Sequence, residues 1–359
     1  MNDTLKPNSI LKAIQPPIGE DSRHPEVAPL LEEAIDSGVL RTLAGQSVLS
    51  ALQFSREQIR ELFKLSAVLQ SVEIAPSHPL DGKLVITAFF EASTRTRISF
   101  ESSVLRLDGK IISIPEANIT GVAKGESLVD IGEMFNAYGD LVIMRHRETA
   151  ALEAIRQRLR VPLVNAGNGA GEHPTQALAD WYALVKWKPQ LLKERPGNGE
   201  RKLRIGILGT PGSMRAVKSF LLMATFFHEH IASVSVVSEY SDPLGDELSG
   251  VIQSSGIDFV VTHKLNECLP ELDVIYMNSI ALEGDAYKTM GEDFKLNTES
   301  PLKPEAVILH PLARLDELDT SLDETPHNLY FSQAHGAVFV RQALMIALLD
   351  RLDRLPDFK

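Results

Sequence analysis

Short apolar runs alternate along this chain with longer amphipathic stretches. The runs are rich in Val, Ile and Leu, as strands buried on both faces are, and the stretches repeat apolar residues every three to four positions, as helices do. The expected strands are 84–90, 110–114, 141–144 and 161–165, followed by 203–208, 234–238, 259–262, 274–277 and 307–309. The expected helices begin with one after a capping box at Ser55 and continue with 95–107, 127–138, 149–159, 175–187, 215–227, 244–254 and 337–352.

Strand–helix alternation predicts α/β architecture with parallel sheets covered by helices. A polar stretch with Pro and Gly, residues 188–200, divides the pattern into two series. We therefore expect two doubly wound parallel-sheet domains linked by helices. The expected division is an N-terminal extension over 1–45, a first domain over 46–187, a second over 200–336, and a C-terminal helical segment over 337–359.

Composition narrows the class of protein. With 359 residues, 44% hydrophobic and 23% charged, the chain suits a soluble protein of two domains. A net charge of −12 argues against a nucleic-acid partner. The single cysteine, Cys268, excludes an internal disulfide and favours a reducing compartment. With no signal-peptide pattern and no apolar stretch of membrane-spanning length, we expect a cytoplasmic protein without a membrane partner.

The segment 93–97, Ser-Thr-Arg-Thr-Arg, lies where an expected strand meets an expected helix. Unpaired N–H groups at a helix N-terminus attract anions, and the side chains of Ser93, Thr94, Arg95 and Thr96 add further donors. The segment therefore predicts a site for a dianion such as phosphate. The alternative is an ordinary N-cap serine followed by surface arginines.

Other polar residues follow later strands. Arg145 comes directly after strand 141–144, at the strand end where open parallel sheets bind ligands. His173 follows the Gly-rich run 167–171 and precedes Pro174, so it begins a helix whose first turn carries Gln176. A histidine in that position is also common as a structural residue. Glycines near 206–212 do not have the G-x-G-x-x-G spacing of a dinucleotide loop.

Four motifs together resemble the aspartate and ornithine carbamoyltransferase family, from about residue 48 to the C-terminus. They are Ser-Thr-Arg-Thr-Arg at 93–97, Met-Arg-His at 144–146, His-Pro-Thr-Gln at 173–176 and His-Pro-Leu-Ala-Arg at 310–314. The segments around 89–97 and 325–343 look like the aspartate branch. The resemblance implies carbamoyl phosphate as donor, with Ser93, Thr94, Arg95 and Thr96 on its phosphate and with Thr96, Arg145 and His173 converging on its carbonyl oxygen. Gln176 could accept from the carbamoyl NH₂.

The resemblance also implies an assembly. The loop 118–127 would reach the neighbouring subunit's site in a homotrimer, with Thr120 and Lys124 at the matching positions and Ala123 where a second lysine is common. An ordinary surface loop is the alternative. The C-terminal helix would return to pack on the first domain. No metal or cofactor is implied, and the sequence does not indicate whether regulatory chains bind.

The match weakens on the acceptor side. Arg215 matches the arginine that binds the acceptor's α-carboxylate, and Leu312 matches a further acceptor-site position. However, Ser279 stands where the aspartate branch has an arginine, and Ala281 stands where it has a glutamine. Lys288 or Lys295 could supply the missing cation, or Ser279 and Glu283 could accept a neutral or cationic side chain. Ala313 replaces the second proline of the fourth motif, which leaves open whether the Leu312–Ala313 bond is cis.

The pattern as a whole predicts a carbamoyltransferase acting on an amino acid, with L-aspartate as the first candidate and pyrimidine biosynthesis as the context. One alternative is a carbamoyltransferase for a different amino acid or amine. Another is a non-catalytic structural or regulatory member of the family. The donor-site residues argue against that last reading, because a scaffold needs none of them.

Overall fold

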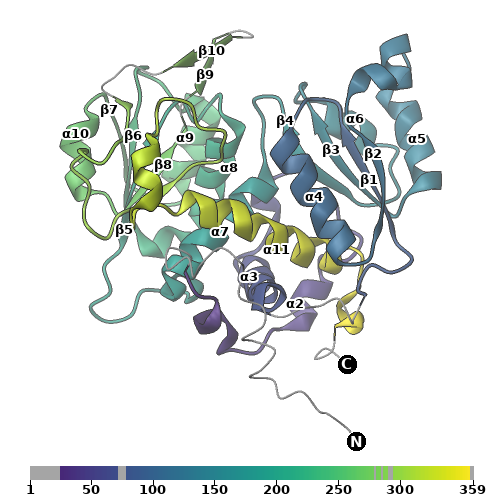
Figure 1. Cartoon of the computed structure of the whole chain (residues 1–359), viewed down its shortest axis with the longest axis horizontal. Helices are drawn as coiled ribbons and strands as arrows, with labels where there is room; N and C mark the ends of the chain where they lie inside the picture. Colours follow the sequence, from purple (N-terminus) through teal and green to yellow (C-terminus); the bar gives the residue numbers. More distant parts are fainter. Residues whose placement is uncertain (1–24, 72–77, 279, 284–285, 290–293, 356–359) are drawn as a thin grey trace, which may run out of the picture.

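The computed structural model describes residues 25–71, 78–278, 280–283, 286–289 and 294–355, and shows two α/β lobes joined by helices (Figure 1). The first lobe has a parallel sheet in the order β2-β1-β3-β4. Its strands are β1 (Leu84–Phe89), β2 (Lys110–Ile114), β3 (Leu141–His146) and β4 (Leu163–Asn168). Its helices are α4 (Thr94–Arg106), α5 (Leu128–Tyr138) and α6 (Ala151–Arg156).

The second lobe has a parallel sheet in the order β11-β8-β5-β6-β7. Its strands are β5 (Leu203–Leu208), β6 (Ile231–Val237), β7 (Phe259–Thr262), β8 (Val274–Met277) and β11 (Val307–Leu309). Its helices are α8 (Arg215–Ala224), α9 (Gly245–Ser254) and α10 (Leu265–Cys268). An antiparallel hairpin of β9 (Ile280–Glu283) and β10 (Ala286–Thr289), not predicted from the sequence, projects from the top of this lobe (Figure 1).

Helices α3 (Arg56–Ser71), α7 (Pro174–Trp187) and α11 (Tyr330–Leu348) join the lobes, beside the short α2 (Ser37–Arg41) (Figure 1). The predicted capping box begins α3: the Gln58 backbone N–H donates to Ser55 Oγ (3.2 Å), and the Ser55 N–H donates to Gln58 Oε1 (2.9 Å). The remaining short turns are 3₁₀: Ala28–Leu31, Ala51–Gln53, Ala117–Ile119, Gly121–Lys124, Pro189–Leu192, Thr225–His230, Leu269–Glu271, Thr320–Glu324 and Leu352–Arg354.

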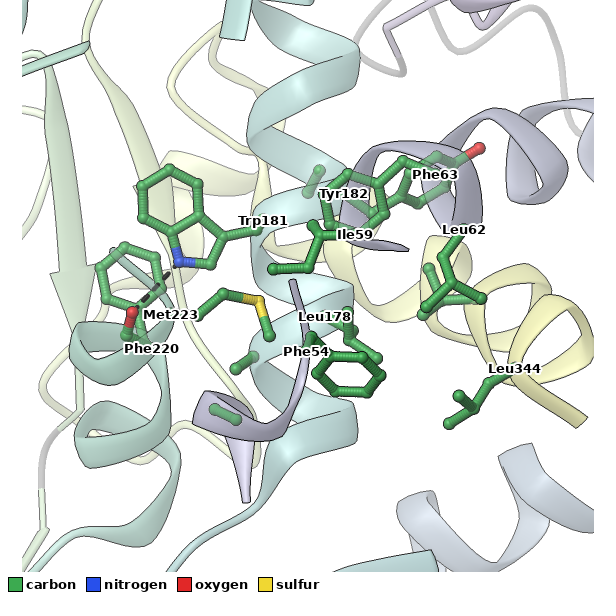
Figure 2. Close-up of a cluster of buried hydrophobic side chains, with 14 of the residues drawn as sticks. Phe54, Ile59, Leu62, Phe63, Leu178, Trp181, Tyr182, Phe220, Met223 and Leu344 are labelled. Carbon is green, nitrogen blue, oxygen red and sulfur yellow. Dashed lines mark hydrogen bonds between the residues drawn. The ribbon is translucent and has the colours of Figure 1, made fainter. Parts of the chain in front are cut away.

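Apolar side chains of α3, α7, α8 and α11 form one core with residues of both sheets (Figure 2). Trp181 of α7 stacks on Phe220 and Phe227, with ring centroids 5.2 and 4.0 Å away, and its indole N–H donates to the Phe220 carbonyl (3.1 Å). A fully buried aromatic ring with its polar atom satisfied is strongly stabilising. The helices that join the lobes, α3, α7 and α11, are called the joint below. They share one hydrophobic core with both lobes.

The α/β fold and the return of the last helix to the first lobe are confirmed. Ser103 of α4 donates to the Val338 carbonyl of α11 (3.0 Å), and the Arg341 guanidinium lies 4.5 Å from the Phe100 ring centroid. The expected start of that helix was wrong, because α11 begins at Tyr330. Its polar first turns are helical because buried partners satisfy them: Lys186 Nζ donates to Ser332 Oγ (2.8 Å). None of the described helices has both the length and the apolar character needed to cross a membrane.

Candidate active site

The carboxyl ends of β1, β3 and β4 meet at one edge of the first sheet, beside the N-terminus of α4. Ser93 caps this helix with extended backbone, φ −160° and ψ 98°, and its hydroxyl makes no capping bond. Thr96 is buried, whereas Thr94 and Arg95 are exposed. The first N–H groups of α4 are therefore not capped by Ser93, which leaves donors for an anion at the position that the sequence predicted.

Arg145 lies inside β3, which runs to His146 instead of ending at residue 144 as predicted, and its side chain is nearly buried. Nη2 pairs with Glu91 Oε1 (2.7 Å), Nη1 donates to the Ala166 carbonyl (3.4 Å), and Nε has no partner among the described residues. Gly167, with φ +112°, makes room for this arrangement, because a Cβ there would lie 3.1 Å from both Arg145 Nη1 and Arg215 Nε. The glycine-rich run thus brings two guanidinium groups against the backbone.

Glu91 lies between those two guanidinium groups and connects the lobes. Arg215, the first residue of α8, donates to Glu91 through Nη1 (2.9 Å) and Nη2 (2.5 Å), and to the Gly169 carbonyl (2.9 Å). Burial raises the pKa of Glu91, and the charge of Arg215 opposes that shift. Arg145 and Arg215 are therefore brought together around a carboxylate that the sequence did not single out.

His173 precedes Pro174 at the start of α7, and its ring is buried. Its backbone N–H donates to Ser219 Oγ (2.8 Å), while Nδ1 lies 3.5 Å from the Thr175 hydroxyl. Nε2 has no partner within the described part of the chain. Burial, followed by the charge of Arg341, lowers the pKa of His173 to about 3, so the imidazole is neutral at physiological pH. A buried neutral ring with an unused nitrogen is suited to polarising a substrate atom.

Gln176 lies in the first turn of α7, where its Nε2 donates to Asp180 Oδ1 (2.7 Å). Asp180 is completely buried and was not identified from the sequence. The side chains of Tyr276 and Gln333 also donate to it. The signal that could have found it is a carboxylate one helical turn after Gln176, on a helix that is otherwise apolar on most faces.

The loop 310–315 of the second lobe meets α4 of the first. The Arg95 guanidinium donates to the Leu312 carbonyl, and the Leu312 N–H donates to His310 Nδ1 (2.8 Å). His310 Nε2 in turn contacts Glu317 Oε1 at 2.9 Å. The Leu312–Ala313 bond, which the sequence left open, is cis. The structure therefore places Leu312 directly beside the predicted phosphate site.

The structure gives little information on the residues that the sequence offered for the acceptor's side chain. Ser279 lies outside the described residues, and the side chains of Ala281, Glu283 and Lys288 are likewise not described. Lys295 pairs with Asp316 (2.7 Å), which makes it less available for a ligand. The assignment of acceptor-binding residues, Arg215 included, stays a prediction.

The loop 118–127 forms the two 3₁₀ turns Ala117–Ile119 and Gly121–Lys124. The Thr120 hydroxyl donates to the Ala117 carbonyl (2.6 Å), and Lys124 is exposed. Lys124 makes no hydrogen bond or ion pair with any other residue that the structure describes. The structure thus leaves its ammonium group open to solvent or to another chain.

Comparison with known proteins agrees with this geometry. Residues 46–186 match the carbamoyl-phosphate-binding domain of the aspartate/ornithine carbamoyltransferase family, and residues 201–348 match its Asp/Orn-binding domain. The chain belongs to this family. Its fold, its transferase class and the resemblance seen in the four motifs are thereby confirmed.

The individual matches carry the aspartate name. The aspartate carbamoyltransferase catalytic subunit of Pyrobaculum islandicum is 35% identical over 85% of this chain and 98% of its own. That of Clostridium kluyveri is 32% identical over 86% and 99%. A crystal structure of Trypanosoma cruzi aspartate transcarbamoylase with carbamoyl phosphate and aspartate has a TM-score of 0.74 and 30% identity, covering 86% of this chain and 98% of that one.

Proposed function

We propose that this chain transfers the carbamoyl group of carbamoyl phosphate to the amine of L-aspartate, giving N-carbamoyl-L-aspartate and phosphate in pyrimidine biosynthesis. The observation that carries the proposal is one sheet edge that combines uncapped helix N–H groups, the exposed Arg95 and the buried, unpartnered His173 Nε2. In this reaction the amine attacks the carbonyl carbon, the bond from that carbon to the phosphate oxygen breaks, and the amine loses a proton.

The donor would bind with its phosphate on Ser93, Thr94, Arg95 and Thr96 at the start of α4. Its carbonyl oxygen would receive hydrogen bonds from Thr96, Arg145 and His173, and its NH₂ would donate to Gln176. Donors already in place for the developing oxyanion stabilise the transition state most, since they need no reorganisation. The neutral state of His173 and the unpartnered Nε of Arg145 support this assignment. We assign donor binding to residues 46–187 and acceptor binding to 200–336.

The acceptor would bind with its α-carboxylate on Arg215 and with its amine near the Leu312 carbonyl. Arg215 is already paired with Glu91, so an acceptor carboxylate must share or replace that contact. A cation for the aspartate side chain remains to be assigned, with Lys288, Lys295 and the Ser279 segment as the positions to test. A different amino-acid acceptor is the second candidate, favoured by the lack of an arginine directly after β8.

The proposed function is tested by supplying carbamoyl phosphate with a panel of amino acids and amines and measuring phosphate release and carbamoylated product. The ratio of kcat/KM for aspartate to that for each other acceptor identifies the substrate. Aspartate is expected to give a kcat/KM of about 10⁴ M⁻¹s⁻¹ or more. Tight donor binding without product from any amine would favour a non-catalytic family member instead.

We further propose a cytoplasmic homotrimer in which Thr120 and Lys124 complete the neighbouring subunit's site. The exposure of Lys124 supports this assembly. Mixing inactive Lys124→Ala chains with inactive Arg95→Ala chains should restore part of the activity, because some sites then draw both intact residues from different chains. Mixed trimers that stay inactive, with their composition verified by mass spectrometry, would rule out shared sites.

A further inference from the structure

Asp180 accepts hydrogen bonds from three parts of the molecule while fully buried. Gln176 Nε2 of α7 donates to Oδ1 (2.7 Å), Gln333 Nε2 of α11 donates to the same oxygen (2.5 Å), and the Tyr276 hydroxyl of β8 donates to Oδ2 (2.8 Å). No lysine, arginine or histidine pairs with it within the described ranges. The charge of Arg341 acts on it only at a distance. A buried carboxylate held this way needs each of its donors in a fixed orientation.

The backbone determines those orientations. The backbone N–H of His310, which can only donate, bonds to Gln333 Oε1 (2.9 Å). The Nε2 of the Gln333 side-chain amide must therefore face Asp180. Asp180 Oδ1 is therefore an acceptor. Gln176 must then present its own Nε2 to the same oxygen, and its Oε1 is left pointing elsewhere with acceptor capacity.

This result does not depend on the protonation of Asp180. Burial raises the pKa of the carboxyl to about 7, so a proton can be present near neutral pH. That proton would lie on Oδ2, because the Tyr276 hydroxyl facing Oδ2 can accept as well as donate, whereas the two amides facing Oδ1 only donate. Oδ1 remains an acceptor in both states.

We infer that Asp180 is a positioning residue that holds the Gln176 amide with its oxygen toward the donor site, so that the site recognises the NH₂ of carbamoyl phosphate. The inference rests on the proposed function, because it assigns the NH₂ to Gln176. If the amide were reversed, Gln176 would present a donor to a donor, and the hydrogen bond would be lost. The same chain of bonds continues through Gln333 to His310, whose Nδ1 accepts from the Leu312 N–H.

Acetyl phosphate gives a direct test, since it carries a methyl group in place of the NH₂. Calorimetric binding of carbamoyl phosphate, acetyl phosphate and inorganic phosphate is compared in the whole enzyme. Wild type is expected to prefer carbamoyl phosphate over acetyl phosphate by about tenfold. In Asp180→Leu this ratio should fall close to one, while inorganic phosphate affinity stays within about threefold of the wild-type value.

Two matched variants sharpen the result. Tyr276→Phe removes only the donor to Oδ2 and should keep the wild-type ratio. Asp180→Asn keeps an acceptor oxygen for both amides and can donate to the Tyr276 hydroxyl, so it should also keep most of the ratio. In a Gln176→Ala background the ratio is already lost, and Asp180→Leu should not lower it further.

An unchanged ratio in Asp180→Leu would overturn the inference, and so would an equal loss of all three ligands with the ratio preserved, because that is the result of a merely structural role. An Asn variant as impaired as the Leu variant would overturn it too. If Asp180→Leu does not fold, Asp180→Ala is measured in the same way. Failure of wild type to bind carbamoyl phosphate at all would instead refute the proposed function.

Discussion

The two lobes handle their positive charges differently. At the edge of the first lobe, Arg95 bonds to a carbonyl and to no acid among the described residues. Arg145 pairs with Glu91 but keeps one buried N–H without a described partner. In the second lobe the cations near the corresponding edge are paired with acids: Lys295 with Asp316, and Arg314 with Asp323. Arg215 is the exception there, because its acid, Glu91, comes from the other lobe.

This difference indicates which half of the site is ready for a ligand. A dianion needs donors that are not already satisfied, since replacing an existing ion pair returns little free energy. The first lobe offers such donors as it stands. Under the proposed function, the acceptor carboxylate would meet Arg215, a cation whose described acid comes from the other lobe, so acceptor binding would be coupled to the way the lobes meet.

The largest effect is expected for His173→Ala. Removing a preorganised donor to the oxyanion should lower kcat by about 10²–10³-fold and change phosphate affinity little. Steady-state kinetics and phosphate calorimetry measure the two quantities. His230→Ala, which removes another buried histidine far along the chain, is the control and should leave kcat near wild type. A normal kcat in His173→Ala would show that the unpartnered His173 Nε2 of the first lobe takes no part in the reaction.

Arg95→Ala should weaken carbamoyl phosphate and inorganic phosphate together, each by about 30-fold, because both present the same dianion. Arg106→Ala, at the other end of α4, is the matched control and should bind both ligands normally. Unchanged phosphate affinity in Arg95→Ala would mean that the exposed arginine of the first lobe is a surface residue.

Arg314→Met tests the paired cations of the second lobe. Asp323 would be left partly buried without its guanidinium, so the free energy of unfolding should fall by about 1–3 kcal/mol. Phosphate affinity should stay the same. Denaturant unfolding measures the stability, and calorimetry measures the phosphate affinity. If phosphate binding weakens while stability is unchanged, Arg314 serves the ligand and not the ion pair, contrary to the difference drawn between the lobes.

The pH dependence of stability tests whether His173 is held neutral. Its pKa of about 3 lies below that of an unfolded histidine, so the unfolded chain binds the extra proton as pH falls below about 6.5. Its contribution to stability is complete above that pH and is lost as pH falls toward about 3. As pH falls from about 6 to about 4, the free energy of unfolding of His173→Asn should therefore decrease less steeply than that of wild type, by on the order of 1 kcal/mol per pH unit. If plots of the free energy of unfolding against pH are parallel for the two proteins, the His173 ring is protonated or solvated in the folded state and the prediction is wrong.

The smallest effect is expected for Lys295→Ala. A pair of this exposure is worth about 1 kcal/mol or less, and KM for aspartate should not change if Asp316 already occupies the ammonium group. Lys303→Ala, at a similar lysine–aspartate pair, is the control. If Lys295→Ala raises KM for aspartate and Lys303→Ala does not, Lys295 binds the acceptor, and its pairing with Asp316 does not keep it from a ligand.

The first-lobe candidates could be selected from the sequence because they lie at or near the carboxyl ends of strands, and their roles stay a prediction. Arg145 and the 93–97 segment needed only the position of a strand and the polarity of a helix terminus. Strands β2, β5, β7, β8 and β11 likewise match their predicted bounds. Such features are local, and local patterns are what a single sequence expresses most directly.

The remainder depends on contacts between distant segments. Glu91 meets Arg215 across 124 positions, and Asp180 meets Gln333 across 153, so neither partner could be paired by spacing. The first turns of α11 are polar and do not show the apolar period of a buried helix. Their helical state depends on Lys186 and Asp180, which lie on a different helix.

The stacked Trp181 has a spectroscopic consequence. Only two tryptophans occur in the chain, Trp181 and Trp187, and both belong to α7. Trp181 touches aromatic rings of the second lobe while its helix also packs on α3 and α11 (Figure 2). Its fluorescence therefore reports on the joint and not on either sheet alone. Because the joint shares its core with both lobes, we expect one cooperative unfolding transition by this probe, coincident with the loss of helical circular dichroism.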